Sequence, residues 1–219
     1  MKASTDKTAR PGVIFDLDGT LWNSVSQVRV AWNGVFKKYG VGIDLTPEMM
    51  KVTMGNTVPE IGELMLSHIE PALRERILKE CCDEEDRLLT LHGGVLYDGV
   101  EELLPELAAK YDLFIVSNCQ DGYIQSFMSY HRTAPYFKDF ECIGRTGLAK
   151  SGNISLIVER NGLEKAVYVG DTLRDMHSAE TAGVPFIHAA YGFGSGFFPE
   201  HAIASFRELP DLLDKLFSE

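Results

Sequence analysis

Short apolar runs recur along the chain and are separated by segments with helical spacing. Several of the runs show no alternation of polar and apolar positions, which is typical of strands in a parallel sheet covered on both faces. The predicted strands are residues 13–17, 113–117, 140–143, 166–169 and 185–188. Strands that alternate with helices indicate βαβ units. The pattern therefore predicts an α/β fold with a doubly wound, mostly parallel, Rossmann-like core sheet.

One long interval, residues 23–93, contains helical patterns and no convincing strand. Its first helix carries an apolar stripe that ends at Gly40, and Thr46 followed by Pro47 is typical of a second helix start. Two more helices are expected at residues 58–69 and 72–91. Because the interval is too long for a loop of the sheet, we expect an inserted α-helical domain at residues 23–93. The core domain would then comprise residues 11–22 and 94–219, preceded by a disordered tail at residues 1–10.

The composition narrows the classes of partner. The 219-residue chain is 45% hydrophobic and has a formal net charge of -11, with a pI near 5.0. This acidity disfavours nucleic acid and anionic membranes as partners, since both favour a basic surface. No apolar run approaches the ~20 residues of a membrane span, and the N-terminus lacks the apolar segment of a secretory signal.

The four cysteines are Cys81, Cys82, Cys119 and Cys142, and their spacing suits neither a metal site nor a disulfide framework. We therefore expect four free thiols and a cytoplasmic location, because the cytoplasm keeps thiols reduced. The oligomeric state is left open between a monomer and a weak dimer.

Polar side chains follow three of the predicted strands at the points where the strands end. The first strand leads into Asp16 and Asp18, the second ends at Ser117 and Asn118, and Asp171 follows the strand at 166–169. Ligands of open α/β sheets bind outside the carboxyl ends of the strands, so these groups are expected at one edge. Buried carboxylates are costly without a partner, which favours a bound cation over a bare strand end.

Asp175 follows Asp171 by about one helical turn and is expected to face the same space. Carboxylate oxygens are the hard ligands that Mg²⁺ takes, usually together with waters and a substrate phosphate oxygen. A cation would also offset the repulsion between these acids. Gly19 and Thr20, in the turn after the first strand, are expected to present backbone N–H groups to an anion. The sequence thus predicts a magnesium and phosphate site at this edge.

Four short motifs, in this order, resemble those of the haloacid dehalogenase superfamily of hydrolases. They are DLDGTL at 16–21, SN at 117–118, Lys150 at the expected start of a helix, and GDTLRD at 170–175. The helical insertion is similar to the family's type-1 cap, and cap and motifs together resemble those of phosphoglycolate phosphatases. Two positions depart from the usual pattern. Asn23 stands where relatives often carry an acid, and Ser151 follows Lys150 where relatives often have proline.

The resemblance implies a Mg²⁺-dependent phosphatase that works through an aspartyl-phosphate. Asp16 would be the nucleophile, and Asp18 would protonate the leaving oxygen and then deprotonate water. Mg²⁺ would be held by the Asp16 carboxylate, the Asp18 backbone carbonyl and Asp171. The metal would neutralise the charge that develops on the phosphoryl group.

The other motif residues would bind phosphate or support the site. Ser117 would hydrogen-bond a phosphoryl oxygen, and Lys150 would place a positive charge beside it and steady Asp16. Asp175 would orient Lys150 or a metal-bound water. Contacts to phosphate are expected from Gly19, Thr20, Ser117, Asn118 and Lys150.

The implied substrate is a small phosphorylated metabolite, phosphoglycolate-like or a sugar phosphate, and the cap would select it. The candidate substrate-facing residues of the cap are Arg29, Gly55, Asn56 and Thr57. Asp18 disfavours a dehalogenase, which does not need this second acid. Two alternatives stay open: a sugar phosphomutase of the same superfamily and a non-catalytic protein that binds a phosphorylated ligand. Val28 disfavours the phosphomutase, because those mutases share a histidine at the corresponding position of the first cap helix.

Overall fold

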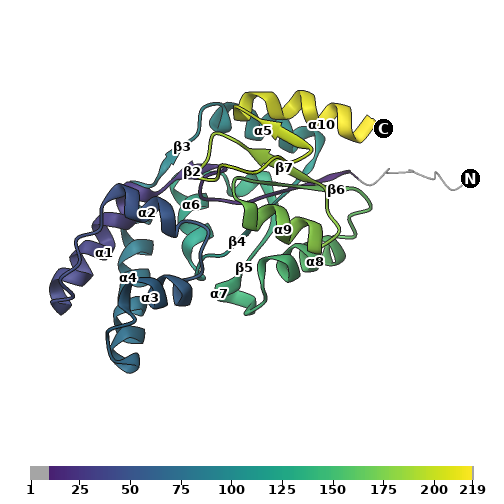
Figure 1. Ribbon diagram of the computed structural model, residues 1–219. Helices are drawn as coiled ribbons and strands as arrows, with labels where there is room; N and C mark the ends of the chain where they lie inside the picture. Colours follow the sequence, from purple (N-terminus) through teal and green to yellow (C-terminus); the bar gives the residue numbers. More distant parts are fainter. Residues whose placement is uncertain (1–9, 219) are drawn as a thin grey trace, which may run out of the picture.

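A parallel sheet forms the centre of the molecule in the computed structural model, which describes residues 10–218 (Figure 1). The six strands lie in the order β5-β4-β1-β6-β7-β8, and every neighbouring pair is parallel. From β1 the chain builds outward to β4 and β5 on one side and to β6, β7 and β8 on the other. This confirms the doubly wound sheet. The strands are β1 Gly12–Phe15, β4 Asp112–Ser117, β5 Phe137–Cys142, β6 Ala166–Gly170, β7 Phe186–Ala189 and β8 His201–Ile203.

Helices cover both faces of the sheet. Ile154 of α8 and Ala179 of α9 pack with Ile14 of β1 on one face. Leu104 of α5 and Leu213 of α10 belong to the apolar cluster on the other face. Burial on both faces explains why the central strands are apolar without alternation. The core helices are α5 Val100–Lys110, α6 Tyr123–Tyr130, α7 Ile143–Thr146, α8 Lys150–Arg160, α9 Leu173–Thr181 and α10 Leu209–Ser218, with single 3₁₀ turns at η1 Ala134–Tyr136 and η2 Phe206–Glu208.

Four helices follow β1 and gather at one end of the sheet (Figure 1). The first ends at Gly40, whose φ of 65° is the left-handed conformation that favours glycine. The Thr46 side chain accepts a hydrogen bond from the N–H of Met49 and caps the second, as its sequence predicts. Thr57 and Glu60 form a capping box at the third. The helices are α1 Val25–Tyr39, α2 Pro47–Thr53, α3 Val58–Leu66 and α4 Pro71–His92.

A short antiparallel ribbon joins the two ends of this helical segment. Trp22 and Asn23 form β2 (Trp22–Asn23), and they pair with Leu96 and Val95 of β3 (Val95–Leu96). The Asn23 side chain also accepts a hydrogen bond from the N–H of Val25 at 3.1 Å. The chain therefore leaves the sheet and returns to it at one place, so that α1–α4 sit over one edge.

Besides shifts of one residue and the unpredicted ribbon β2–β3, three strands of the main sheet differ from the prediction. β1 ends at Phe15, two residues early, because the carbonyl of Leu17 already accepts the hydrogen bonds of the next turn. β5 starts at Phe137, before its apolar run, since an edge strand tolerates polar residues. β8 is absent from the prediction because its three residues, beginning with His201, form no apolar run.

The N-terminal segment is anchored from Arg10 onward. The Arg10 guanidinium donates to the carbonyls of Ala108, Lys110 and Tyr111, so this residue is not part of a free tail. Residues 1–9 of the expected tail lie outside the described residues. The four cysteines carry free thiols. Among the described residues, no helix combines the length and apolar character that a membrane crossing needs.

Candidate active site

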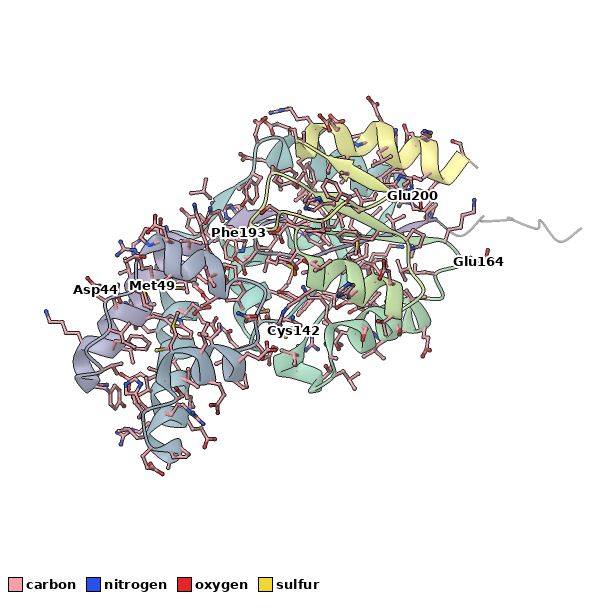
Figure 2. All side chains as sticks on the ribbon, viewed as in Figure 1. Asp44, Met49, Cys142, Glu164, Phe193 and Glu200 are labelled. Atoms are coloured by element: carbon pink, nitrogen blue, oxygen red, sulfur yellow. The ribbon has the colours of Figure 1, made fainter. Side chains whose placement is uncertain are left out.

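The carboxyl ends of β1, β4 and β6 meet at the edge of the sheet that faces α1–α4. Figure 2 shows Cys142, the last residue of β5, near this edge, and Glu164, just before β6, at the opposite end. Asp16, Ser117 and Asp171 are buried at this edge, each directly at or after the end of its strand. The parallel topology therefore brings together side chains that are far apart in the sequence.

Lys150 lies between two carboxylates at the centre of the site. Its Nζ is 2.8 Å from Oδ1 of Asp16 and 2.5 Å from Oδ1 of Asp175, and all three side chains are less than 5% exposed. Burial opposes the charge of Lys150, but the two carboxylates outweigh it and raise the pKa of the ammonium well above its ordinary value. The helix α8 begins at this lysine, which places it beside β1 and α9.

Asp175 is locked by hydrogen bonds on both of its oxygens. Oδ1 pairs with Lys150, and Oδ2 accepts from the backbone N–H of Thr172 at 3.0 Å and from its hydroxyl at 2.6 Å. The Thr172 hydroxyl in turn accepts from the N–H of Asp175, which completes a capping box at the start of α9. These contacts leave Asp175 suited to holding Lys150 in place.

Asp171 is also fully buried but is poorly satisfied. Oδ2 accepts a hydrogen bond from the N–H of Phe193 at 2.6 Å, whereas Oδ1 is buried with no hydrogen-bond partner in the part of the chain that the structure describes. Burial, followed by repulsion from Asp16 and Asp175, raises the pKa of Asp171 to about 8. Phe193, labelled in Figure 2, belongs to the glycine-rich loop after β7, which thus borders the site.

The residues present fit a divalent cation. Asp16, Asp171 and Asp175 each offer an oxygen, and these three atoms lie within 4.8 Å of one another. One buried ammonium, Lys150, pairs with Asp16 and Asp175, and one oxygen of Asp171 has no hydrogen-bond partner among residues 10–218. A hard cation with oxygen ligands would supply both the missing charge and the missing contact. The Asp18 side chain is not part of this cluster.

Asp18 is held by two hydroxyl groups. Its Oδ1 accepts from the Ser24 hydroxyl at 2.5 Å and from the Tyr123 hydroxyl at 3.0 Å. Burial raises the pKa of Asp18 to about 6, against the opposing effect of the hydrogen bonds from Ser24 and Tyr123. Sequence reasoning missed both partners. Tyr123 is 105 residues away in the chain, at the start of α6, and only the fold brings it to β1.

The turn at Gly19 and Thr20 differs from the expectation. The N–H of Gly19 donates to the carbonyl of Trp22 at 2.9 Å, and the N–H of Thr20 donates to Leu17 at 3.3 Å. Both amides are thus used to close the turn, and the expected phosphate cradle from these two N–H groups is wrong. Gly19 serves another purpose: at φ 86°, a Cβ here would lie 2.2 Å from an oxygen of Asp171.

A cavity of about 60 Å³ lies between the helical segment and the sheet edge. Ser117 and Asn118 line it from the sheet edge, and the Asn118 side chain donates to the carbonyl of Gly55 at 3.0 Å, so it links this edge to the helical segment. Gly55 and Asn56 line it from the other side, as expected. Thr57 instead caps α3, and neither it nor Arg29 is among the lining residues.

Glu85 of α4 lines the same cavity and was not singled out by the sequence. Oε2 accepts from the indole N–H of Trp32 at 2.5 Å, and Oε1 accepts from the Gln120 amide at 3.2 Å. Burial raises the pKa of Glu85 to about 8, although these two hydrogen bonds act in the opposite direction. Glu85 carries no sequence signal because it sits among the many acids of an amphipathic helix.

Known proteins resemble this chain in sequence over most of their length, and solved structures resemble it in fold. A phosphoglycolate phosphatase of Xanthomonas campestris is 28% identical over 191 residues, which cover 84% of this chain and 85% of that protein. A 5'-nucleotidase of Pseudomonas aeruginosa is 24% identical over 216 residues, covering 93% and 96%. The crystal structure of a putative haloacid dehalogenase-like hydrolase from Bacteroides fragilis has a TM-score of 0.80 at 21% identity. It covers 91% of this chain and 99% of that one.

The model of one protein family spans most of the chain. The haloacid dehalogenase-like hydrolase model matches residues 13–189, which run from β1 to the end of β7 and include all four motifs. The resemblance inferred from those motifs is thereby confirmed. With its doubly wound sheet and its cluster of buried acids, the chain belongs to the haloacid dehalogenase-like hydrolase family.

Proposed function

We propose that this protein is a Mg²⁺-dependent phosphatase that hydrolyses a small phosphomonoester through an aspartyl-phosphate. The observation that carries the proposal is the buried set of Asp16, Lys150 and Asp175 beside the unpartnered oxygen of Asp171. The set lies at one end of a cavity that Asp18 and Ser117 also line. Its relatives named phosphoglycolate phosphatase and 5'-nucleotidase act on small phosphate esters, which supports this substrate class.

Asp16 performs the attack on phosphorus. A carboxylate oxygen of Asp16 forms the new bond to phosphorus, and the bond between phosphorus and the alcohol oxygen breaks. Lys150 fixes the Asp16 carboxylate through its 2.8 Å contact and lends positive charge to this side of the phosphoryl group. Ser117 reaches the cavity from the end of β4 and hydrogen-bonds a phosphoryl oxygen.

Asp18 moves the proton in both half-reactions. It donates a proton to the leaving alcohol oxygen, and then removes a proton from the water that hydrolyses the aspartyl-phosphate. Ser24 and Tyr123 hold its carboxyl group in one orientation for both steps. Asp16, Asp171 and the backbone carbonyl of Asp18 would hold Mg²⁺, which supplies charge neutralisation to the phosphoryl group when bound.

The helical segment acts as a cap over this centre. We assign residues 23–93 to a cap domain and residues 11–22 with 94–219 to the core domain, the ribbon β2–β3 being the hinge between them. Contacts between cap and core include the hydrogen bond from Asn118 to the Gly55 carbonyl and the ion pair of Arg174 of α9 with Glu60 of α3. Closure excludes water from the reaction. The free thiols support a reducing, cytoplasmic location.

The test is phosphate release from a panel of small phosphomonoesters, with Mg²⁺ and with EDTA. We expect turnover that needs the metal and falls by at least about 1,000-fold in Asp16→Asn, because the nucleophile is lost. Asp44→Asn, on the exposed surface of the cap, is the matched control. A folded, Mg²⁺-binding protein that releases no phosphate from any ester would contradict the proposal and favour a non-catalytic binding protein.

A further inference from the structure

Glu85 is a buried carboxyl group in the cavity that takes no part in the proposed reaction. It is 5% exposed and comes from the middle of α4. Trp32 of α1 and Gln120 of the loop after β4 each donate to one of its oxygens, at 2.5 Å and 3.2 Å. Two donors from different parts of the molecule fix the carboxyl group at the cavity wall. Burial of a carboxyl group costs free energy even with such partners, so its place in the cavity wall points to a role in binding.

The ionisable side chains around the cavity are all acids. Among the residues that the structure describes, those lining it are Asp16, Asp18 and Glu85, with no lysine, arginine or histidine. Lys150 is committed to Asp16 and Asp175 at the phosphoryl end. The cap contributes a mainly apolar lining, made of Val28, Trp32, Met50, Met54, Val58 and Ile61.

This lining sets a condition on the leaving group. A carboxylate on the leaving alcohol would be buried in a cavity whose lining offers no lysine, arginine or histidine to pair with it, which is costly. A hydroxyl group on the same alcohol would instead find a hydrogen-bond partner in Glu85 while its carbon atoms contact the apolar wall. The cavity volume of about 60 Å³ also favours a small alcohol.

We propose that the leaving alcohol is small and uncharged and that one of its hydroxyl groups hydrogen-bonds Glu85, which acts as the specificity-determining residue. This inference rests on the phosphatase activity proposed above and narrows its substrate class. The preferred substrates are phosphomonoesters of neutral diols and polyols, and phosphoglycolate, despite the names of several relatives, is a poor substrate.

Two esters that differ in one group test this directly. 2-Hydroxyethyl phosphate and 2-phosphoglycolate differ only in a CH₂OH group against a carboxylate. The wild-type enzyme with Mg²⁺ is expected to show a kcat/KM at least about tenfold higher for the hydroxyethyl ester, because a buried charge left unpaired is strongly rejected. An equal or higher kcat/KM for phosphoglycolate would overturn the inference. So would a kcat/KM for the cationic ester phosphoethanolamine that exceeds the value for the hydroxyethyl ester. Both outcomes would leave the phosphatase proposal intact.

A variant then tests Glu85 itself. Glu85→Lys is expected to shift the ratio of the two kcat/KM values at least about tenfold towards phosphoglycolate, since it supplies the missing cation. Glu75→Lys, on the exposed face of the same helix, should leave the ratio unchanged. Glu85→Gln adds no cation and should not improve phosphoglycolate turnover.

The outcomes separate the two proposals. An unchanged ratio in a folded Glu85→Lys protein would contradict the role of Glu85. If that variant does not fold, the wild-type comparison of the two esters still decides the substrate class. Turnover of neither ester nor of any other phosphomonoester would overturn the phosphatase proposal and this inference with it.

Discussion

The two walls of the cavity bury carboxyl groups in opposite ways. On the core wall, Asp16 and Asp175 share the ammonium of Lys150, and Asp171 lies within the same cluster. On the cap wall, Glu85 stands among apolar side chains and is met by neutral N–H donors. The core wall thus gathers ionised groups around a buried ammonium, whereas the cap wall holds a single carboxyl group with neutral donors. Under the two proposals above, the core wall would carry the chemistry and the cap wall would select the leaving group.

The largest expected effect comes from breaking the charge balance of the core wall. Lys150→Met leaves two buried carboxylates without their cation, and the free energy of unfolding should fall by about 3–5 kcal/mol. Urea denaturation measures this loss. Lys138→Met is the matched control, because Lys138 is exposed and pairs with one carboxylate, Asp112, for a loss of at most about 1 kcal/mol. Equal losses in both variants would contradict the central role of Lys150.

Metal binding at the core wall should increase the stability of the folded protein. Saturating Mg²⁺, at about 100 times its Kd, is expected to raise the free energy of unfolding by about 2.7 kcal/mol, and EDTA should reverse this. Thermal denaturation with and without Mg²⁺ is the measurement. Asp171→Asn should lose most of the stabilisation, because the unpartnered oxygen is replaced or neutralised. A shift as large in Asp171→Asn as in the wild type would place the metal elsewhere.

The cap wall should respond to pH rather than to metal. Burial raises the pKa of Glu85 from 4.5 in a free chain to about 8, so between these values the folded state binds more protons than the unfolded state. Its contribution to stability therefore decreases as pH rises through this window. Glutamine does not titrate, so the stability of Glu85→Gln relative to the wild type should rise by up to about 1.4 kcal/mol per pH unit.

Urea denaturation at pH 5.5 and pH 7.5, in EDTA, compares the two proteins. Glu75→Gln on the exposed face of α4 should show no such dependence. A relative stability of Glu85→Gln that is flat across the window would mean that Glu85 is ionised in the folded protein throughout.

The smallest effect is expected where the two walls are joined. The ion pair of Arg174 and Glu60 links α9 to α3, but both side chains are about half exposed. Exposed pairs are screened, so Arg174→Ala should cost at most about 1 kcal/mol and change kcat/KM by less than about threefold. A loss of kcat/KM beyond tenfold would show that this pair controls cap closure.

The core wall could largely be predicted from the sequence. Asp16, Ser117 and Asp171 each end an apolar run, and in a parallel sheet the ends of the strands share one edge. Lys150 was placed by motif order, and the structure brings its ammonium to Asp16 across 134 positions of sequence. The details of the turn could not be predicted, since whether Gly19 and Thr20 keep free N–H groups depends on which carbonyls lie nearby.

The cap wall shows what sequence reasoning could not reach. Trp32, Glu85 and Gln120 come from two cap helices and a core loop, and their hydrogen bonds span 53 and 35 positions. Helical periodicity located the helices because it depends on local spacing. It could not show that one acid of α4 turns inward, because α4 carries many acids and only packing against α1 and the core decides which one is buried.

By itself, the sequence determined the alternation of strands and helices, the helical insertion after β1 and the residues at the strand ends. These features follow from local patterns, namely apolar runs, helix caps and short motifs. The tertiary structure alone decided the partners of those residues. Asp18 meets Tyr123, Asp171 keeps an unpartnered oxygen, and Glu85 faces the cavity because distant elements pack there. Pairings between distant residues depend on how the layers close, and no local pattern records that.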